Sequence, residues 1–376
     1  MKVYVTALVL SVIFAYLYRV VSNRVEASKE RGESVYIKKK KRRGVGSPFA
    51  VTMAVLSALP LTAVAAFRVG VGTDYYTGYV YSYYYNMAYN AGYYKTEPLY
   101  DLLESSVAFF KAPEIWIFIV SSVIVGALYY YCFFKYSINP EYSILMYFLT
   151  NIYFISLNAV RQGIAMSIIF LAIMVYNKGK TKVFLLLVLM AMGFHTSSVV
   201  FFLLPLLRKI SFSVSSSLMM LLALAVGGGV IGRAARVVIS LTRYAGYYNS
   251  MFDENEFDIF NTAIQLAILI MYSFYLERAR QTEHKNMFEI CYILQLMATF
   301  CIIQSATIPA IKRIVWHLST NQFIGIPMVS LIEDSKLVKL IFNTAVIVLF
   351  AISIYKGDVV NGAHQILPYH SWFEYL

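Results

Sequence analysis

The most constraining feature of this chain is a series of apolar windows, each about 20 residues long and almost free of charge, the length of helix that crosses a bilayer. Backbone polar groups must be paired internally within lipid. This favours helices over the strands of a barrel, whose sequences alternate over about ten residues. Only 14% of the 376 residues are charged, against about a quarter in soluble domains. We therefore predict an all-α polytopic membrane protein, with residues 1–376 forming one transmembrane helix bundle.

The windows predict about twelve spans. We expect the first to be a true span rather than a cleaved signal peptide, because bulky charged residues follow it instead of a small-residue cleavage site. The expected spans lie near residues 3–21, 48–66, 113–134, 142–158, 160–177, 183–194, 196–207, 213–232, 259–277, 287–305, 314–332 and 339–355.

The basic residues predict the orientation of these spans. With the N-terminus outside, 21 of the 32 Lys and Arg residues fall in the inner loops and their flanks, as the positive-inside rule requires. The longest run, KKKKRR at Lys38–Arg43, lies in a basic loop over 22–47. Basic loops beside membrane spans are attracted to anionic lipid headgroups. We therefore assign 22–47 to the cytoplasm and predict no nucleic-acid partner.

The hexapeptide GFHTSS, Gly193–Ser198, interrupts a long apolar stretch. The basic segments on either side, 178–182 and 208–209, both favour the cytoplasm, which excludes a single span between them. Two passes of about 12 residues, each about 18 Å long, keep both segments inside. We therefore predict a short or re-entrant hairpin whose tip places His195 on the outer side, facing a cavity rather than lipid.

Polar residues collect on the outer side of this topology. Each has an ordinary alternative: arginines that snorkel at the interface, a hydrogen-bonded core histidine, or helix-to-helix glue from Asn158, Arg161 and Gln162 on one helical face. Ionisable groups in membrane spans are costly and mark substrate paths, so their co-location favours a site for an anionic substrate. The residues are Arg68, Thr73, Asp74, Glu97, Tyr100, Asn158, Arg161, Gln162, His195, Ser197, Arg243, Tyr244 and Arg313.

The outer loop over 67–112 is rich in tyrosine, and its segment TDYYTGYVYSYYYNMAYNAGYY alternates aromatic and small polar residues. Such residues form belts at membrane interfaces, and aromatic faces with hydroxyl rims also match sugar rings. The chain has no P-loop, GxGxxG, HExxH or DxD-like motif, and its three cysteines show neither disulfide nor metal spacing. An ATP-driven pump and a soluble-type nucleotide-sugar transferase are therefore not expected.

In these motifs the chain resembles the EpsG/Wzy family of exopolysaccharide and O-antigen (capsular polysaccharide) polymerases. The matching elements run from the second span onward. They are FRVGVGTDYYTGY (Arg68, Gly72, Asp74, Tyr75), TEPLY (Glu97, Pro98, Tyr100), LNAVRQGIA (Asn158, Arg161, Gln162), GFHTSS (His195, Ser197) and a late arginine, Arg313. From the family pattern we expect a tyrosine shortly after that arginine, where this chain has Trp316 and His317.

The resemblance implies a metal-independent glycosyltransferase of the bacterial cytoplasmic membrane that uses no cofactor. It would join oligosaccharide repeat units carried on undecaprenyl pyrophosphate at the outer leaflet, alongside the flippase and chain-length regulator of the same pathway. Arginine binds phosphate oxygens through two parallel bonds and stays charged, which suits a pyrophosphate leaving group. The expected substrate-binding residues are Arg68, Arg161, Gln162, Asn158, Arg313, Arg243, Tyr75 and Tyr100.

A general base must take the proton of the acceptor hydroxyl, and the candidate catalytic residues are His195, Asp74 and Glu97. Imidazole matches neutral pH best, whereas a carboxylate serves when it is partly desolvated. We prefer His195. Asp74 would then orient Arg68 or hold a sugar hydroxyl.

Two other functions stay open: a transporter such as a flippase for lipid-linked oligosaccharide, and a membrane O-acyltransferase acting on surface sugars, which also needs a histidine. A transporter should carry polar groups at both leaflets and internal repeats. Neither is apparent in the sequence.

The predicted orientation can be tested by thiol labelling. A cysteine placed at Lys40 should resist a membrane-impermeant thiol reagent added to intact cells, because loop 22–47 is assigned to the cytoplasm, while one at Tyr84 should react. The native cysteines lie within or beside predicted spans, so the parent protein is the unlabelled control. Reversed labelling would place the polar residues in the cytoplasm and overturn the assignment.

Overall fold

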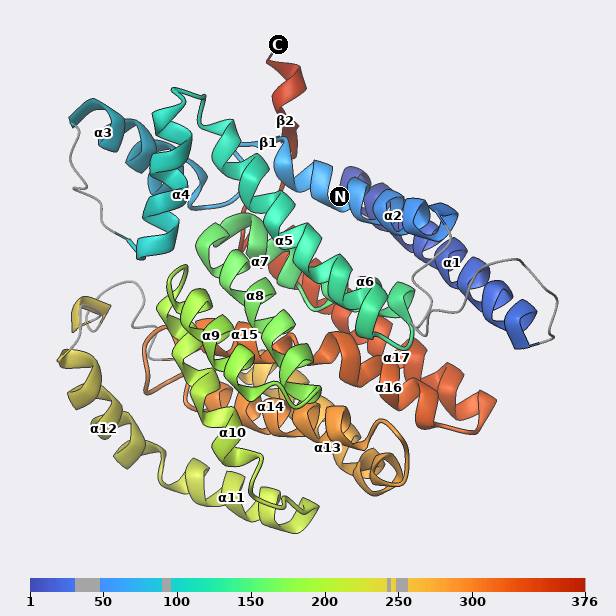
Figure 1. The fold of residues 1–376 in the computed structure, drawn as a ribbon. Coiled ribbons are helices and arrows are strands. Elements are labelled where there is room, and N and C mark those ends of the chain that lie inside the picture. The colour runs from blue at the N-terminus through green and yellow to red at the C-terminus, as the bar shows by residue number, and fades with distance from the viewer. Residues whose placement is uncertain (31–47, 90–95, 242–244, 248–255, 376) are drawn as a thin grey trace. The chain divides into compact units, whose positions relative to one another are not determined.

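The computed structural model describes residues 1–30, 48–89, 96–241, 245–247 and 256–375 (Figure 1). The described chain is mostly helical, which confirms the all-α expectation. It divides into two compact units, Met1–Ser167 with Ile352–Leu376, and Ile168–Ala351. The basic loop expected over 22–47 falls mostly outside the described residues, and α1 continues to Glu30.

The first unit combines long helices with a short antiparallel sheet. Its elements are α1 (Lys2–Glu30), α2 (Pro48–Ala66), β1 (Arg68–Val69), the π-helix η1 (Tyr75–Val80), α3 (Tyr81–Tyr89), α4 (Pro98–Phe109), α5 (Ile115–Tyr136), α6 (Pro140–Leu149), α7 (Ile152–Asn158), the start of α8 (Val160–Asn177), the π-helix η4 (Tyr355–Val360), β2 (His370–Ser371) and the 3₁₀ helix η5 (Trp372–Glu374). In the Tyr-rich segment 67–112, the described residues therefore include the short helices η1, α3 and α4. Proline at the first turns of α4 and α6 favours a helix start at those positions.

Helices α1, α2 and α5 of this unit pack closely. Gly126 on α5 lies so near α2 that a Cβ there would clash with the Thr62 side chain. At one end of the bundle, β1 pairs with β2, with Arg68 opposite Ser371. The Tyr4 hydroxyl at the start of α1 donates to the carbonyl of Ile366, 3.0 Å away. The start of α1, the end of α2 and the C-terminal segment therefore lie together.

The second unit is built around α13, α14 and the broken pair α15 and α16. Its elements are the rest of α8, α9 (Thr181–Met192), the 3₁₀ helix η2 (Thr196–Leu203), α10 (Leu204–Leu207), α11 (Val214–Val226), α12 (Gly228–Ser240), the 3₁₀ helix η3 (Ala245–Tyr247), α13 (Ile259–Arg280), α14 (Lys285–Ile303), α15 (Lys312–Ser319), α16 (Gln322–Ile332) and α17 (Lys336–Ile354) up to Ala351. Asp258 caps α13 by accepting from the backbone N–H of Asn261 at 3.0 Å.

A buried amide network fixes the break between α15 and α16. Gln295 on α14 donates to the side chain of Gln265 on α13 at 2.8 Å, and Gln322 donates to both at 3.0 Å. Asn321, in the break itself, donates to Gln295 at 3.2 Å and accepts from Tyr272 at 3.1 Å. Buried polar side chains whose donors and acceptors are hydrogen bonded to one another hold helices together where no water is available.

Seven described helices are long and apolar enough to cross a membrane, or eight if the bent pair α11 and α12 counts as one span. The other expected spans are shortened. The 142–158 window breaks between α6 and α7, where Asn151 has φ +68°. The 314–332 window breaks between α15 and α16. The two predicted passes around His195 are the short apolar helices Thr181–Met192 and Thr196–Leu207. Twelve full-length spans are therefore not seen, and the N-terminal orientation remains a prediction.

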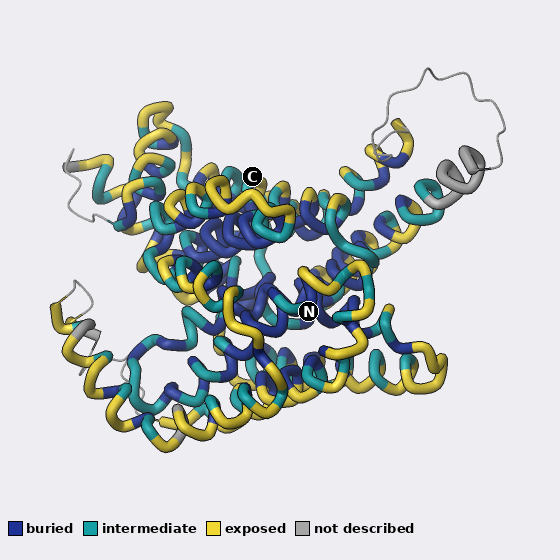
Figure 2. The backbone as a smooth tube through the Cα atoms, turned by 60° about the horizontal axis from the view of Figure 1, so that its bottom comes forward, coloured by how far each residue is buried: buried dark blue, intermediate teal, exposed yellow. Residues whose placement is uncertain are grey.

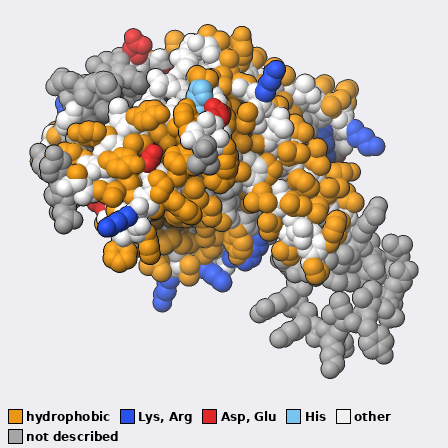
Figure 3. All heavy atoms as spheres, turned by 90° about the horizontal axis from the view of Figure 1, so that it is seen from above, with side chains coloured by type: hydrophobic (Ala, Val, Ile, Leu, Met, Phe, Trp, Pro, Cys, Tyr) orange, Lys and Arg blue, Asp and Glu red, His pale blue; other side chains and the backbone are white. Residues whose placement is uncertain are grey.

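The outer faces of the helices are apolar. Figure 2 shows buried residues in the interior of the helix packing and exposed residues along the outward faces. Exposed large hydrophobic side chains include Phe109, Leu222 and Phe274. The face drawn in Figure 3 is mostly hydrophobic, with few charged groups. Apolar outward faces of this kind are expected for a multi-pass helical membrane protein.

Candidate functional site

The turn after α2 is locked onto the end of α7. Gly72 has φ +109°, and a Cβ there would lie 3.2 Å from the Asn158 Cα atom, so only glycine fits without strain. The Asn158 side-chain oxygen accepts from the Thr73 hydroxyl at 2.8 Å and from the Asp74 backbone N–H at 3.0 Å. Two of the predicted motifs, far apart in sequence, are thus joined through one asparagine.

The expectation that Asn158, Arg161 and Gln162 share one helical face is wrong. Helix α7 ends at Asn158, because Ala159 leaves the helical region with ψ +70°, and α8 begins at Val160. The Asn158 side chain is turned to the glycine loop, while Gln162 is buried at 1% exposure. Arg161 alone of the three keeps a side chain about one third exposed.

Arg161 is held by a buried carboxylate. Its Nη1 atom donates to the Glu97 Oε2 atom at 2.7 Å, and the Glu97 side chain is only 5% exposed. The guanidinium also lies 5.8 Å from the ring centre of Tyr100 and hydrogen bonds to Tyr79. Arg161 stands in the first turn of α8, where the positive end of the helix dipole attracts anions. These contacts fix a guanidinium that still reaches the surface.

The two tyrosines predicted to bind substrate are packed inside the first unit. Tyr75 stacks on Phe118 with ring centres 4.3 Å apart, and Tyr100 meets Tyr79 edge-on at 5.9 Å. Neither the Tyr75 nor the Tyr100 hydroxyl has a hydrogen-bond partner among the described residues. The aromatic faces that are exposed in this segment belong to Tyr76, Tyr81 and Tyr84.

Arg68 is fully buried and contacts backbone rather than a carboxylate. It donates to the carbonyl of Ala65 at the end of α2 and, at 2.9 Å, to that of Leu157 at the end of α7. Its guanidinium lies 4.7 Å from the Phe118 ring centre. Burial lowers the pKa of the Arg68 guanidinium, but arginine stays charged in proteins. Asp74 is not among its hydrogen-bond or ion-pair partners in the described chain, so the expected orientation of Arg68 by Asp74 is not seen.

In the second unit, His195 forms the tip of the α9–η2 hairpin. It caps η2: its Nδ1 atom accepts from the Ser197 backbone N–H at 3.4 Å and lies 2.6 Å from the Ser197 hydroxyl oxygen. His195 is nearly buried, at 9% exposure. Since Nδ1 accepts, the neutral ring carries its proton on Nε2.

A second histidine completes this cluster. His317 on α15 lies with its ring centre 5.9 Å from that of His195. Its Nδ1 atom is 3.0 Å from the Arg313 carbonyl oxygen, which can only accept, so Nδ1 carries the proton. The Ser197 hydroxyl is 3.4 Å from that Nδ1, and the Ser198 hydroxyl is 3.3 Å from Nε2. Both serines of the GFHTSS turn therefore contact His317.

Arg313 lies one helical turn before His317 on α15 and is half-buried. Its neighbour Lys312 pairs with the cap residue Asp258 at 3.0 Å. Arg243 and Tyr244, which the sequence also predicted on the outer side, lie outside the described residues. In the described part of the chain, no three His, Cys, Asp or Glu side chains are placed to hold a metal ion.

The model of the EpsG family matches residues 51–371, most of the chain. The chain belongs to the EpsG family. The match confirms the resemblance seen in the motifs, and it includes both the Arg161–Glu97 pair and the His195–His317 cluster of this EpsG protein. No curated protein and no solved structure matches the chain.

Two buried polar residues of this EpsG protein, His317 and Glu104, are not among the site residues predicted from the sequence. His317 stands where the family pattern suggested a tyrosine, and that departure was the available signal. Glu104 is the other: it is 4% exposed on α4 and accepts from the Ser82 hydroxyl at 3.1 Å. Burial raises the pKa of the Glu104 carboxyl above its ordinary value. Nothing in the sequence around Glu104 distinguishes it from an exposed helix residue.

The raised pKa of Glu104 predicts a pH-dependent stability effect. Below the ordinary carboxyl pKa, both folded and unfolded chains hold the proton, and Glu104 contributes nothing. Above it the unfolded chain ionises first, so the free energy of unfolding falls until the pH passes the raised pKa. Glu104→Gln should therefore raise the Tm of the purified protein by a few degrees at about pH 7 and leave it unchanged near pH 4.

The glutamine can be accommodated, since the Asn86 side-chain oxygen near Glu104 has no hydrogen-bond partner among the described residues and can accept from the new amide. The matched control is Glu283→Gln, whose side chain is 88% exposed and whose Tm difference should be small at both pH values. An equal Tm difference at both pH values for Glu104→Gln would contradict a burial-raised pKa.

Proposed function

We propose that this protein is a polysaccharide polymerase that joins undecaprenyl-pyrophosphate-linked oligosaccharide repeat units by glycosyl transfer at the outer leaflet of the bacterial cytoplasmic membrane. Membership of the EpsG family indicates a polymerase-type role, and the apolar helices agree with a membrane location. The observation that carries the proposal is the Arg161–Glu97 pair, a fixed and partly exposed guanidinium beside a tyrosine-rich surface.

Arg161 is assigned to the pyrophosphate. Glu97 engages one nitrogen of the guanidinium at 2.7 Å and so sets its orientation, while the remaining donors and the α8 N-terminus favour a bound anion. Because the Arg161 guanidinium is already held in position, it can stabilise the charge that develops on the leaving pyrophosphate without moving during the reaction. Because its carboxylate is committed to Arg161, Glu97 is a positioning residue rather than the general base.

The sugar portion is assigned to the surface of the tyrosine-rich segment. Tyr76, Tyr81 and Tyr84 offer exposed aromatic faces. Tyr75 and Tyr100 pack in the interior of the same unit. The half-buried Asp74 carboxylate lies 3.4 Å from the Thr73 hydroxyl, which has a closer acceptor in Asn158 at 2.8 Å. Asp74 therefore keeps acceptor capacity for a sugar hydroxyl. Arg68 and Gln162 are too buried to bind substrate, and Arg68 instead holds the ends of α2 and α7.

His195 is assigned to proton transfer. With Nδ1 accepting from Ser197, the acceptor sugar hydroxyl gives its proton to the Ser197 oxygen as the serine proton passes to Nδ1. The sugar oxygen bonds to the anomeric carbon, and the bond from that carbon to the pyrophosphate oxygen breaks. The resulting imidazolium later releases the proton to water. His317, whose Nδ1–H points to Ser197 and the Arg313 carbonyl, orients the serine.

Reconstitution tests the function as a whole. The purified protein in liposomes, supplied with a defined lipid-linked repeat unit, should convert single units into long chains. A transporter would move the units across the bilayer without joining them, and an O-acyltransferase would modify them without changing chain length. Either result in place of chains would overturn the proposal.

The pyrophosphate role of Arg161 predicts that lysine cannot replace it, because a point charge lacks the planar fork. Arg161→Lys and Arg161→Ala should lower the rate of chain growth about 10²-fold or more, the usual effect of losing a charge-stabilising donor. Polymer length and rate are measured in the reconstituted system at matched protein levels. Arg233→Lys, on the exposed surface of α12, is the control and should grow chains normally. Normal chains from Arg161→Lys would remove Arg161 from the site.

The proton-transfer role predicts that His195→Gln, which keeps size and hydrogen bonding but takes no proton, slows chain growth about 10²–10⁴-fold. Carrier binding should persist, since Arg161 is intact. Ser197→Ala should be similarly slow if the serine relays the proton. The matched control is His284→Gln, at the start of α14. If His195→Gln grows chains at the wild-type rate, the imidazole is only a cap of η2 and Asp74 must serve as the base.

A further inference from the structure

The second unit contains a polar pocket at the end of the α9–α10 hairpin opposite to His195. Its volume is about 180 Å³, far more than the roughly 10–15 Å³ that one water requires. It lies between the segment after α10, the end of α13 and the first turns of α14. The polar and aromatic side chains that line it include Arg208, Lys209, Arg280, Glu289 and Tyr292.

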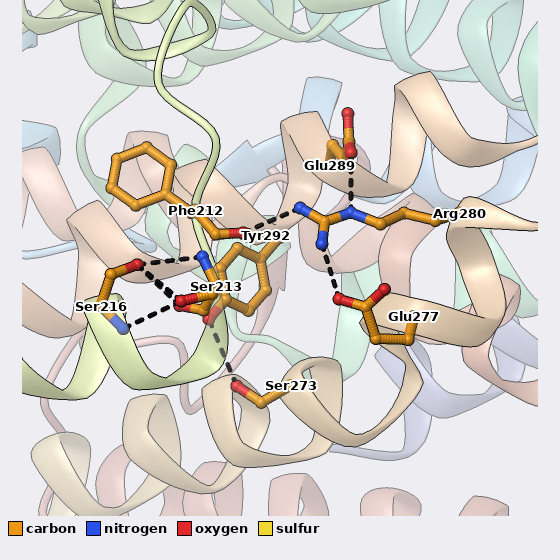
Figure 4. Close-up of polar contacts among 8 residues, drawn as sticks. All are labelled: Phe212, Ser213, Ser216, Ser273, Glu277, Arg280, Glu289 and Tyr292. Atoms are coloured by element: carbon orange, nitrogen blue, oxygen red, sulfur yellow. Dashed lines mark hydrogen bonds and ion pairs between the residues drawn. The ribbon is translucent and has the colours of Figure 1, made fainter.

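Arg280 lines this pocket, and hydrogen bonds hold its guanidinium in place (Figure 4). Its Nε atom donates to Glu289 at 3.0 Å, its Nη1 atom to Glu277 at 2.6 Å and its Nη2 atom to the Phe212 carbonyl at 2.8 Å. Three different groups therefore determine the plane of one guanidinium. Such an arrangement orders the chain after α10 against the α13–α14 turn.

Arg208 enters from the other side. Its Nη1 atom donates to Glu289 at 2.5 Å, and its Nη2 atom donates to Asn286 at 3.1 Å. One carboxylate, Glu289, thus serves two arginines, and Glu277 pairs with Arg280 from outside the pocket. Lys209, next in the chain, is exposed, and its side chain has no hydrogen-bond or ion-pair partner among the described residues.

The charges that line the pocket are unbalanced. Three cations face one carboxylate there, and Glu277, the remaining acidic partner, is 70% exposed in its side chain and lies outside the lining. A concave surface with excess positive charge and planar guanidinium groups matches the oxygens of a phosphate. Basic pockets between membrane helices bind phospholipid headgroups in this way.

Apolar side chains beside the pocket favour a lipid as the source of that phosphate. Ile210 lines the pocket and is 52% exposed, and Leu206 on the preceding turn is 58% exposed. A headgroup bound among the cations would let its acyl chains lie along these residues. The basic turn 178–182 at the start of α9 lies at the same end of the hairpin as the pocket. Tyr176, just before this turn, is close enough to Arg208 to interact with its charge.

We propose that this pocket binds a phosphate group, carried by the headgroup of an anionic phospholipid. The site is separate from the residues assigned to glycosyl transfer, so its test does not depend on polymer formation. On the predicted topology it faces the cytoplasmic leaflet.

The experiment measures lipid binding to the delipidated full-length protein in neutral detergent, by native mass spectrometry. Phosphatidylglycerol, phosphatidylcholine and inorganic phosphate are the three probes. The wild-type protein should bind phosphatidylglycerol more tightly than phosphatidylcholine. Lys209→Gln should weaken phosphatidylglycerol binding about fivefold, the effect expected of one basic residue near an anionic headgroup, and Lys209→Glu should weaken it further. Both variants change an exposed side chain and should fold normally.

The matched control is Lys285→Gln, an exposed lysine on the first turn of α14 that does not line the pocket. It should bind phosphatidylglycerol as the wild-type protein does. Binding of inorganic phosphate that depends on Lys209 and excludes the lipid would assign a soluble phosphate to the same pocket. Equal binding of phosphatidylglycerol and phosphatidylcholine, or equal effects of Lys209→Gln and Lys285→Gln, would overturn the proposal.

Discussion

The first unit depends on one buried cation, the guanidinium of Arg68. It is bonded to the carbonyls of Ala65 and Leu157, at the C-terminal ends of α2 and α7, where helix dipoles are negative. A buried charge that lost these carbonyls would be strongly unfavourable, so the two helix ends are tied together. The glycine turn that follows β1 and the start of α8 are placed as a result, and with them Asp74 and Arg161.

The second unit depends on a polar network instead of a charge. The amides of Gln265, Gln295 and Gln322 bond to one another in its core. These hydrogen bonds stabilise the interruption between α15 and α16, where an entirely apolar sequence would continue as one helix. Because α15 ends at that break, His317 is presented to the serines of the GFHTSS turn. The proton-transfer group of the proposed reaction therefore rests on hydrogen bonds far from the group itself.

The α9–η2 hairpin separates two kinds of chemistry within the second unit. Its tip carries His195, a titratable group paired with serine, and its base carries the arginines that share Glu289. Two short apolar helices keep these groups apart. A single full-length span would have placed the basic residues on opposite sides of the membrane, so the short hairpin reconciles the apolar stretch with its flanking charges.

The sequence by itself determined the helical class, most of the apolar helices, the short hairpin around His195 and the family, because each follows from local composition or from motifs in order. Only the tertiary structure decided the partners. The burial of Arg68, the commitment of Glu97 to Arg161 and the contact of His317 with Ser197 join residues distant along the chain. At the helix break after Asn158, the asparagine side chain likewise accepts from the distant Thr73 and Asp74. No local pattern encodes which distant group a polar side chain will meet.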